Sequence, residues 1–192
     1  MSAAAHLTSV DANDLAEVEA LLEAFRARSP SANARFFDRY QSQVNALVWS
    51  LLGADADHDD VVHAAFESML KAVAKVRSAH ALRGWVRTVT INAVRIELRR
   101  RRWRRRFGVD DQATLEHPDL QAGDAEQRDR ARDLYRALTG LDAEARMAVV
   151  LRHVEGYELT EVAAVMKCSL ATIKRRLEKA ESRLGVLLGE TR

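Results

Sequence analysis

The chain has 192 residues, 30 basic and 28 acidic side chains with a formal net charge of +2, and 47% hydrophobic residues. This balance excludes a wholly disordered chain and suits one ordinary domain or two small ones. Only 8 glycines and 2 prolines interrupt the sequence, too few for the turns of a β-sandwich or barrel, so we expect an all-α fold. The single cysteine, Cys168, excludes an internal disulfide and a multi-cysteine zinc site.

No segment has the pattern of a membrane span or a secretory signal. The longest apolar runs are far too short to cross a bilayer. The first residues also lack a basic start followed by an apolar stretch. We therefore expect a cytoplasmic protein with no membrane insertion.

The first two predicted helices are recognised by their apolar spacing and by the residues at their ends. The first spans residues 14–27. Ser29 is expected to cap the second helix, with Pro30 at its first position, and Gly53 is expected to end it. The inward stripe expected for the second helix consists of Phe37, Tyr40, Val44, Leu47, Val48 and Leu51.

Two further helices complete a bundle predicted over residues 30–107. The third opens at Asp57, with Asp60 three residues later in its first turn. A short loop is expected at residues 77–80, and a long fourth helix follows it. The fourth helix is expected to carry inward Leu82, Trp85, Val86, Val89, Ala93 and Ile96.

Charge is strongly segregated along the chain. Residues 83–106 contain ten arginines and a single acid, Glu97, whereas residues 110–126 contain six acids and no Lys or Arg. Mutual repulsion among the arginines favours a compensating anion. A second basic cluster near the C-terminus consists of Lys167, Lys174, Arg175, Arg176, Lys179 and Arg183. Two basic patches separated by an acidic stretch predict two contacts with a polyanion, although solvated helix faces are the alternative for either patch.

The strongest local pattern is a helix-turn-helix over residues 159–178. A short helix, Leu159–Met166, precedes the turn Lys167-Cys168-Ser169 and a longer helix. Ser169 suits an N-cap, because its hydroxyl can accept a hydrogen bond from an orphan backbone N–H. Lys167 stands where a left-handed residue, commonly glycine, is expected. The outward face of the second helix, which suits a DNA groove, carries Ala171, Thr172, Lys174, Arg175, Glu178 and Lys179. An ordinary αα-corner is the alternative.

Three segments in this order resemble a bacterial RNA polymerase sigma factor of the small, two-domain extracytoplasmic-function family. They read ADADHDDVVHAAFESMLKAV, LRGWVRTVTINAVRIELRRRR and LTGLDAEARMAVVLRHVEGYELTEVAAVMKCSLATIKRRLEKAESRL. The resemblance covers about residues 34–106 and 134–188. It implies two small helical domains joined by an acidic linker. The expected boundaries are an N-terminal helix or extension at 1–29, a region-2-like bundle at 30–107, the linker at 108–128 and a region-4-like helix-turn-helix domain at 129–192.

The resemblance also implies a function and the residues that would carry it. The protein would bind core RNA polymerase through Asp59, Asp60 and His63 and direct it to specific promoters. The bundle would read the minus-ten element through Arg77, Ser78, His80, Arg83, Trp85, Arg87, Thr88, Asn92, Arg95 and Arg99. The helix-turn-helix would read the minus-thirty-five element through Lys167, Ser169, Ala171, Thr172, Lys174, Arg175, Arg176 and Lys179. The implied partners are core polymerase and promoter DNA, and an anti-sigma factor is a further partner that the sequence leaves open.

Two other functions remain open at this point. A dimeric helix-turn-helix regulator acting without polymerase would form a stable dimer on a palindromic site. An inactive sigma-like protein would occupy polymerase without starting transcription. An enzyme is disfavoured, because His58 and His63 are five residues apart and do not share one helix face. We therefore expect no catalytic residue, no metal and no cofactor.

Overall fold

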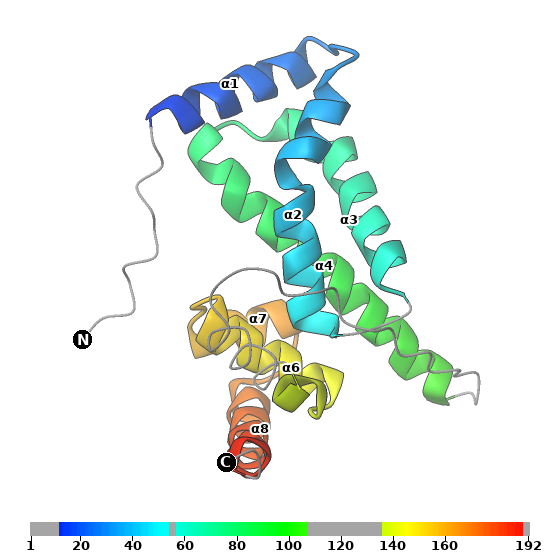
Figure 1. Ribbon diagram of the computed structural model, residues 1–192, viewed down its shortest axis with the longest axis vertical. Helices are drawn as coiled ribbons and strands as arrows, with labels where there is room; N and C mark the ends of the chain where they lie inside the picture. Colours follow the sequence, from blue (N-terminus) through cyan, green and yellow to red (C-terminus); the bar gives the residue numbers. More distant parts are fainter. Residues whose placement is uncertain (1–11, 54–56, 107–135, 190–192) are drawn as a thin grey trace. The chain divides into compact units, whose positions relative to one another are not determined.

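The computed structural model describes residues 12–53, 57–106 and 136–189, so the predicted acidic linker at 108–128 lies outside the described residues. All regular structure in these three ranges is helical, which confirms the all-α prediction. None of the helices in these ranges is long and apolar enough to cross a membrane. The helices, labelled in Figure 1, are α1 (Ala12–Arg26), α2 (Ala32–Leu52), α3 (His58–Ala72), α4 (Ala79–Arg106), α6 (Ala143–Val149), α7 (Leu159–Met166) and α8 (Leu170–Gly189).

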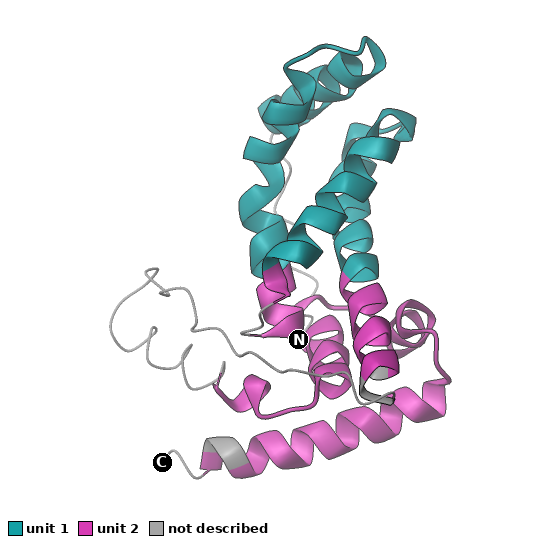
Figure 2. Cartoon of the chain, turned by 90° about the vertical axis from the view of Figure 1, so that its right-hand side faces the viewer, with its two compact units in different colours: residues 1–47, 59–93 teal, residues 48–58, 94–192 magenta. Residues whose placement is uncertain are grey.

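The chain forms two compact units, coloured separately in Figure 2. Unit 1 consists of residues 1–47 and 59–93, and unit 2 consists of residues 48–58 and 94–192. Helices α2 and α4 therefore contribute to both units. The domain boundaries expected from the sequence stay predictions.

The core of unit 1 is built around Phe36 of α2, which is fully buried. Its ring lies 5.7 Å from Phe25, 4.9 Å from Tyr40 and 6.2 Å from Phe66, measured between ring centroids. The expectation that Phe37 lies on the inward stripe of α2 is wrong, because Phe37 is 44% exposed. Adjacent residues on a helix point about 100° apart, so Phe36 faces the core directly while Phe37 lies at its edge, with its ring 4.8 Å from that of Phe66. Helix α1 belongs to the same core and buries Val18, Leu21 and Leu22.

The predicted end of α2 is confirmed, whereas its predicted start is wrong. The helix begins at Ala32, whose N–H donates to the carbonyl of Ser29 over 3.1 Å, and Pro30 lies in the preceding turn. The expected Ser29 cap and Pro30 first position are therefore wrong by two residues. Gly53 does end the helix, because it adopts φ +76° and donates to the carbonyl of Trp49 over 2.8 Å. A positive φ is the conformation that glycine adopts at least cost.

Helix α4 begins earlier and faces its core differently from the expectation. Its first residue is Ala79, so His80 lies in the helix and the loop is limited to residues 76–78. The side chains that it buries include Leu82, Val86, Ile91, Val94 and Leu98. Ile96, expected to face inward, is 52% exposed. With Thr90, which is also fully buried, the stripe follows spacings of three and four residues, and position 96 falls on the opposite side of the helix.

In unit 2, α6 and α7 precede the long helix α8. Asp142 caps α6 by accepting a hydrogen bond from the N–H of Ala145 over 2.9 Å. The helix continues into a π-helical turn, Val150–Val154, and the chain then reverses at Gly156, where φ is +74°. Helices α7 and α8 pack against each other, and Val162 of α7 and Ile173 and Leu177 of α8 are buried.

Candidate nucleic-acid interfaces

Helix α4 presents two rows of the residues expected to bind the minus-ten element. Trp85, Thr88, Asn92, Arg95 and Arg99 follow spacings of three and four residues, which places them along one helix face. His80, Arg83 and Arg87 share a second row with the same spacing. Arg77 and Ser78 stand in the loop just before the helix and are exposed.

Each row contains both exposed and half-buried side chains. His80, Arg83, Thr88 and Arg99 are exposed, whereas Trp85, Arg87, Asn92 and Arg95 are half-buried. The Thr88 hydroxyl donates to the carbonyl of Gly84 over 2.9 Å, one turn back along the helix. The exposed cations Arg83 and Arg99 are suited to phosphates.

A buried carboxylate organises the second half of α4. Glu97 is the one acid within the arginine-rich segment 83–106, and its side chain is only 8% exposed. It pairs with Arg100 at 2.9 Å, Arg101 at 3.1 Å and Arg104 at 2.9 Å, all measured between nitrogen and oxygen. The Glu97 carboxylate therefore compensates part of the positive charge of these arginines, for which the sequence suggested an external polyanion.

Asp57, immediately before α3, extends the same network. Its carboxylate accepts from Arg101 at 3.0 Å and from Arg104 at 3.1 Å. Burial acts to raise the pKa of Asp57, but the hydrogen bond from Arg104 and the charges of Arg101 and Arg104 outweigh it and hold that pKa below its ordinary value. The network joins the start of α3 to the end of α4 within unit 2.

The residues expected to bind polymerase lie together at the start of α3. Asp59, Asp60 and His63 are all exposed and occupy the first two turns of the helix. Two carboxylates at a helix N-terminus are favoured by the helix dipole. One turn further on, Glu67 and Lys71 form an exposed ion pair of 2.6 Å. The three residues therefore form one accessible acidic corner.

The helix-turn-helix has the bounds that the sequence predicts. Helix α7 ends at Met166, Lys167 adopts the left-handed conformation with φ 50° and ψ 50°, and α8 begins at Leu170. Ser169 caps α8, since its hydroxyl accepts from the N–H of Thr172 over 3.1 Å. The same hydroxyl lies 2.8 Å from that of Thr172, so the Thr172 hydroxyl is engaged in the cap.

The start of α8 displays a basic outer face. Ala171, Lys174, Arg175 and Lys179 are exposed, as expected for residues that meet DNA. Arg176 differs from them, because its guanidinium is half-buried and forms an ion pair with Glu144 of α6. It also lies 3.7 Å from the Sγ of Cys168. The structure thus brings Lys174 and Arg175 to the open face and turns Arg176 toward the neighbouring helix.

Sequence reasoning missed two groups around these interfaces. Glu144, which holds Arg176, was not singled out, because nothing local marks a partner that is 32 residues away. Leu170 is 37% exposed at the first position of α8, although an apolar side chain there would ordinarily be assigned to the core. Its neighbours Ser169 and Ala171 were the only hint of an exposed position.

These features define an all-α DNA-binding protein with a helix-turn-helix and a second basic surface on a long helix. The chain belongs to the ECF sigma factor family, whose profile matches residues 15–188. It is similar to the ECF RNA polymerase sigma factor SigM of Mycobacterium tuberculosis H37Rv, with 29% identity over 169 residues, 88% of this chain and 83% of that protein. The RNA polymerase sigma factor CarQ of Myxococcus xanthus is 28% identical over 172 residues, 88% of this chain and 96% of that protein.

Solved structures share the fold. The sigma factor RpoE of Bartonella quintana, crystallised with the anti-sigma factor NepR, superposes with a TM-score of 0.57 at 23% identity. The match covers 84% of this chain and 99% of that one. CnrH, solved in complex with the cytosolic domain of CnrY, superposes with a TM-score of 0.50 at 21% identity, over 89% and 96% of the two chains.

Membership of this family establishes the general activity. The protein is a transcription initiation factor that binds core RNA polymerase and directs it to promoters. A dimeric regulator acting without polymerase is not favoured.

Proposed function

We propose that the protein divides promoter recognition between two surfaces, with α4 and the loop before it on the minus-ten element and α8 on the minus-thirty-five element. The exposed basic start of α8 behind a capped turn carries this proposal. A helix of this kind reads base edges with its first turns while neighbouring cations hold phosphates. Lys174 and Arg175 are the two side chains of α8 that we assign to the groove.

The minus-ten surface suits a single strand. The half-buried Trp85 offers an aromatic surface, and the flanking Arg83, Arg95 and Arg99 carry charge for the backbone. Stacking of a base on an aromatic side chain contributes about 1–3 kcal/mol and is tolerant of sequence. Hydrogen-bonding groups such as Asn92 supply the preference between bases.

The acidic corner at the start of α3 binds polymerase in this proposal. Asp59, Asp60 and His63 are exposed and lie on one helix. Complementary charge accelerates association and selects the partner more than it raises affinity. A basic or polar surface of core polymerase is the partner that this corner fits.

The remaining parts of the proposal concern cell biology. The protein acts in the cytoplasm as an accessory subunit, and polymerase supplies the chemistry. Both solved structures described above are complexes with a second protein, and in the RpoE structure that protein is an anti-sigma factor, so an anti-sigma factor is a partner to test here.

The experiment is transcription by core polymerase on a supercoiled pool of genomic fragments, with and without the protein. Discrete new start sites are expected only when the protein is present. The Lys174→Ala, Arg175→Ala double variant should lose most of this activity. Its DNA binding should also depend less steeply on salt, by about 0.9 in the logarithmic slope for each phosphate that the protein no longer neutralises. Lys71→Ala removes an exposed charge from α3, outside the basic cluster of α8, and serves as the control.

Each outcome separates one interpretation from the others. New starts that survive the double variant would contradict the assignment of α8 to the minus-thirty-five element. Co-elution with core polymerase without new starts would indicate a protein that occupies polymerase but does not initiate.

A further inference from the structure

The first residue of α8, Leu170, is an exposed leucine on the helix assigned above to the minus-thirty-five element. Its side chain is 37% exposed, whereas the same helix buries its aliphatic residues Ile173 and Leu177. Leu170, Lys174 and Glu178 are four residues apart, so they form one row along α8. Leu170 therefore lies on the same face as Lys174, one turn nearer to the N-terminal end that contacts base edges in a helix-turn-helix.

The polar side chains around this end of α8 are engaged within the protein. The Ser169 hydroxyl accepts from the N–H of Thr172 over 3.1 Å and lies 2.8 Å from the Thr172 hydroxyl. Arg176 forms an ion pair with Glu144 of α6, so its guanidinium is turned away from the exposed face. The exposed side chains within residues 170–177 are Leu170, Ala171, Lys174 and Arg175.

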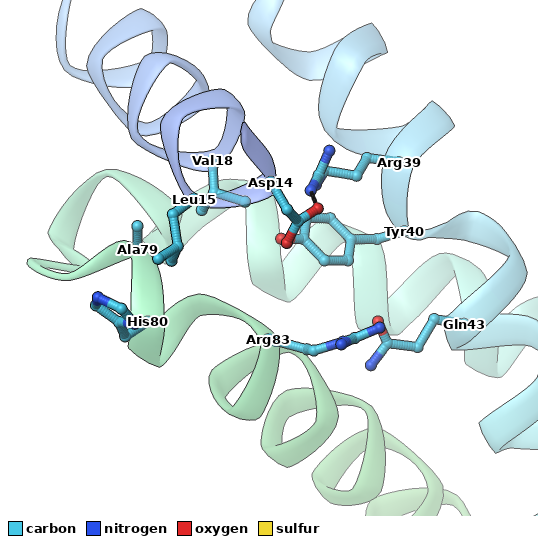
Figure 3. A pocket seen from close by; sticks show the side chains of 9 residues that line it. All are labelled: Asp14, Leu15, Val18, Arg39, Tyr40, Gln43, Ala79, His80 and Arg83. Atoms are coloured by element: carbon cyan, nitrogen blue, oxygen red, sulfur yellow. Dashed lines mark hydrogen bonds and ion pairs between the residues drawn. The ribbon is translucent and has the colours of Figure 1, made fainter. Parts of the chain in front are cut away.

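Helix α8 also has no amide side chain with which to read adenine. Proteins read adenine in the major groove through a bidentate Asn or Gln, and none of the residues Leu170–Gly189 is an Asn or Gln. An amide lies instead in unit 1, where Gln43 and Arg83 extend toward each other in a pocket between α1, α2 and α4 (Figure 3).

The exposed side chains of α8 match two features of base pairs in the major groove. The cations Lys174 and Arg175 suit guanine, which presents two acceptors there. An A·T pair presents the 5-methyl group of thymine, which apolar side chains contact. Leu170 and Ala171 are the apolar side chains available for that contact, and the leucine extends further from the helix than the alanine.

We propose that Leu170 is a specificity-determining residue, whose side chain contacts the 5-methyl group of a thymine in the minus-thirty-five element. This inference rests on the assignment of α8 to that element. The contact favours thymine over cytosine at one position, because cytosine lacks the methyl group. Its loss should weaken binding about fourfold, the effect of exposing one buried CH₂ group.

The test compares thymine with deoxyuridine, which differs from it only by the missing 5-methyl group. Holoenzyme is assembled from core polymerase and the full chain on a promoter from which it initiates. Each thymine on both strands of the minus-thirty-five element is replaced in turn, and the holoenzyme concentration that half-saturates the promoter is measured. We expect one replacement to weaken binding about fourfold with the unsubstituted protein. With Leu170→Ala the same replacement should cost less than about 1.5-fold, because the methyl group has already lost its partner.

Two further variants distinguish a base contact from a structural role. Leu170→Met keeps a long apolar side chain and should retain most of the sensitivity to the methyl group. Val186→Ala truncates an exposed apolar residue near the other end of α8 and should retain all of it. A Leu170→Ala variant that weakens binding to the thymine and deoxyuridine promoters equally would indicate a structural role and overturn the proposal.

The outcomes separate this proposal from the assignment on which it rests. A deoxyuridine scan without effect in the unsubstituted holoenzyme, together with a strong loss of binding for the Lys174→Ala, Arg175→Ala double variant, would overturn the role of Leu170 alone. A minus-thirty-five element with no thymine on either strand would have the same meaning. Normal promoter binding by the double variant would instead overturn the assignment of α8.

Discussion

Replacing Glu97 by glutamine is the sharpest test of the network that orders the second half of α4. The substitution keeps the shape of the side chain and removes its charge. Glu97 is 8% exposed and Arg101 is 15% exposed, so the pair lies largely out of water. Breaking a buried ion pair by removing one partner costs about 3–5 kcal/mol, because the other charge is left uncompensated.

The structure places the expected cost at the lower end of that range. Asp57 continues to accept from Arg101 and Arg104, which limits how much positive charge is left without a partner. The pair between Glu97 and Arg100 adds little, because Arg100 is mostly exposed. We therefore expect Glu97→Gln to lower the free energy of unfolding by about 3 kcal/mol. For a chain of this size that corresponds to a fall in Tm of about 6–12 °C.

The assay is urea and thermal unfolding followed by far-ultraviolet circular dichroism. The matched control is Glu67→Gln, which removes a glutamate from an exposed pair with Lys71 on α3 and should leave stability unchanged within error. Glu97→Gln combined with Arg101→Gln should cost less than the sum of the single variants, since both remove the same interaction. A loss for Glu97→Gln no larger than that for Glu67→Gln would refute the reasoning.

Three further predictions concern stability. Because the pKa of Asp57 is lowered on folding, its contribution is present above about pH 4 and is lost as pH falls through the folded value; Asp57→Asn should therefore flatten the loss of unfolding free energy in acid, measured by urea titration at several pH values. Ser169→Ala should cost about 1 kcal/mol of unfolding free energy by removing the cap of α8, and Ser169→Thr should retain most of it. Phe36→Ala should cost about 3–5 kcal/mol, whereas Phe37→Ala at the exposed neighbour should cost about 1 kcal/mol or less; equal losses would contradict the observed orientation of α2.

Local chemistry made much of the fold predictable. The bounds of α7, the turn and the start of α8 follow from residues within ten positions of one another, as do the Ser169 and Asp142 caps and the stop at Gly53. Capping hydrogen bonds and left-handed turn residues involve near neighbours in the chain, so the sequence pattern contains all the partners. The exposed basic face of α8 was also predictable, because the residues that form it lie close together in the chain.

Tertiary packing decided what the pattern left ambiguous. Phe36 and Phe37 are equally apolar and both rings lie near Phe66, but Phe36 also packs on Phe25 of α1 and is the one that is fully buried. Ile96 is apolar and was therefore expected to be buried, but no helix in the described ranges covers its side of α4 closely enough to bury it.

The arginines show the same division between sequence and structure. Their number and their segregation can be counted in the sequence, and the sequence alone predicts an anionic partner. Which of them are compensated internally depends on Asp57, 44 residues before Arg101, and on Glu144, 32 residues before Arg176. Charge interactions act through space and not along the chain, so only the folded structure determines which cations Glu97, Asp57 and Glu144 already hold.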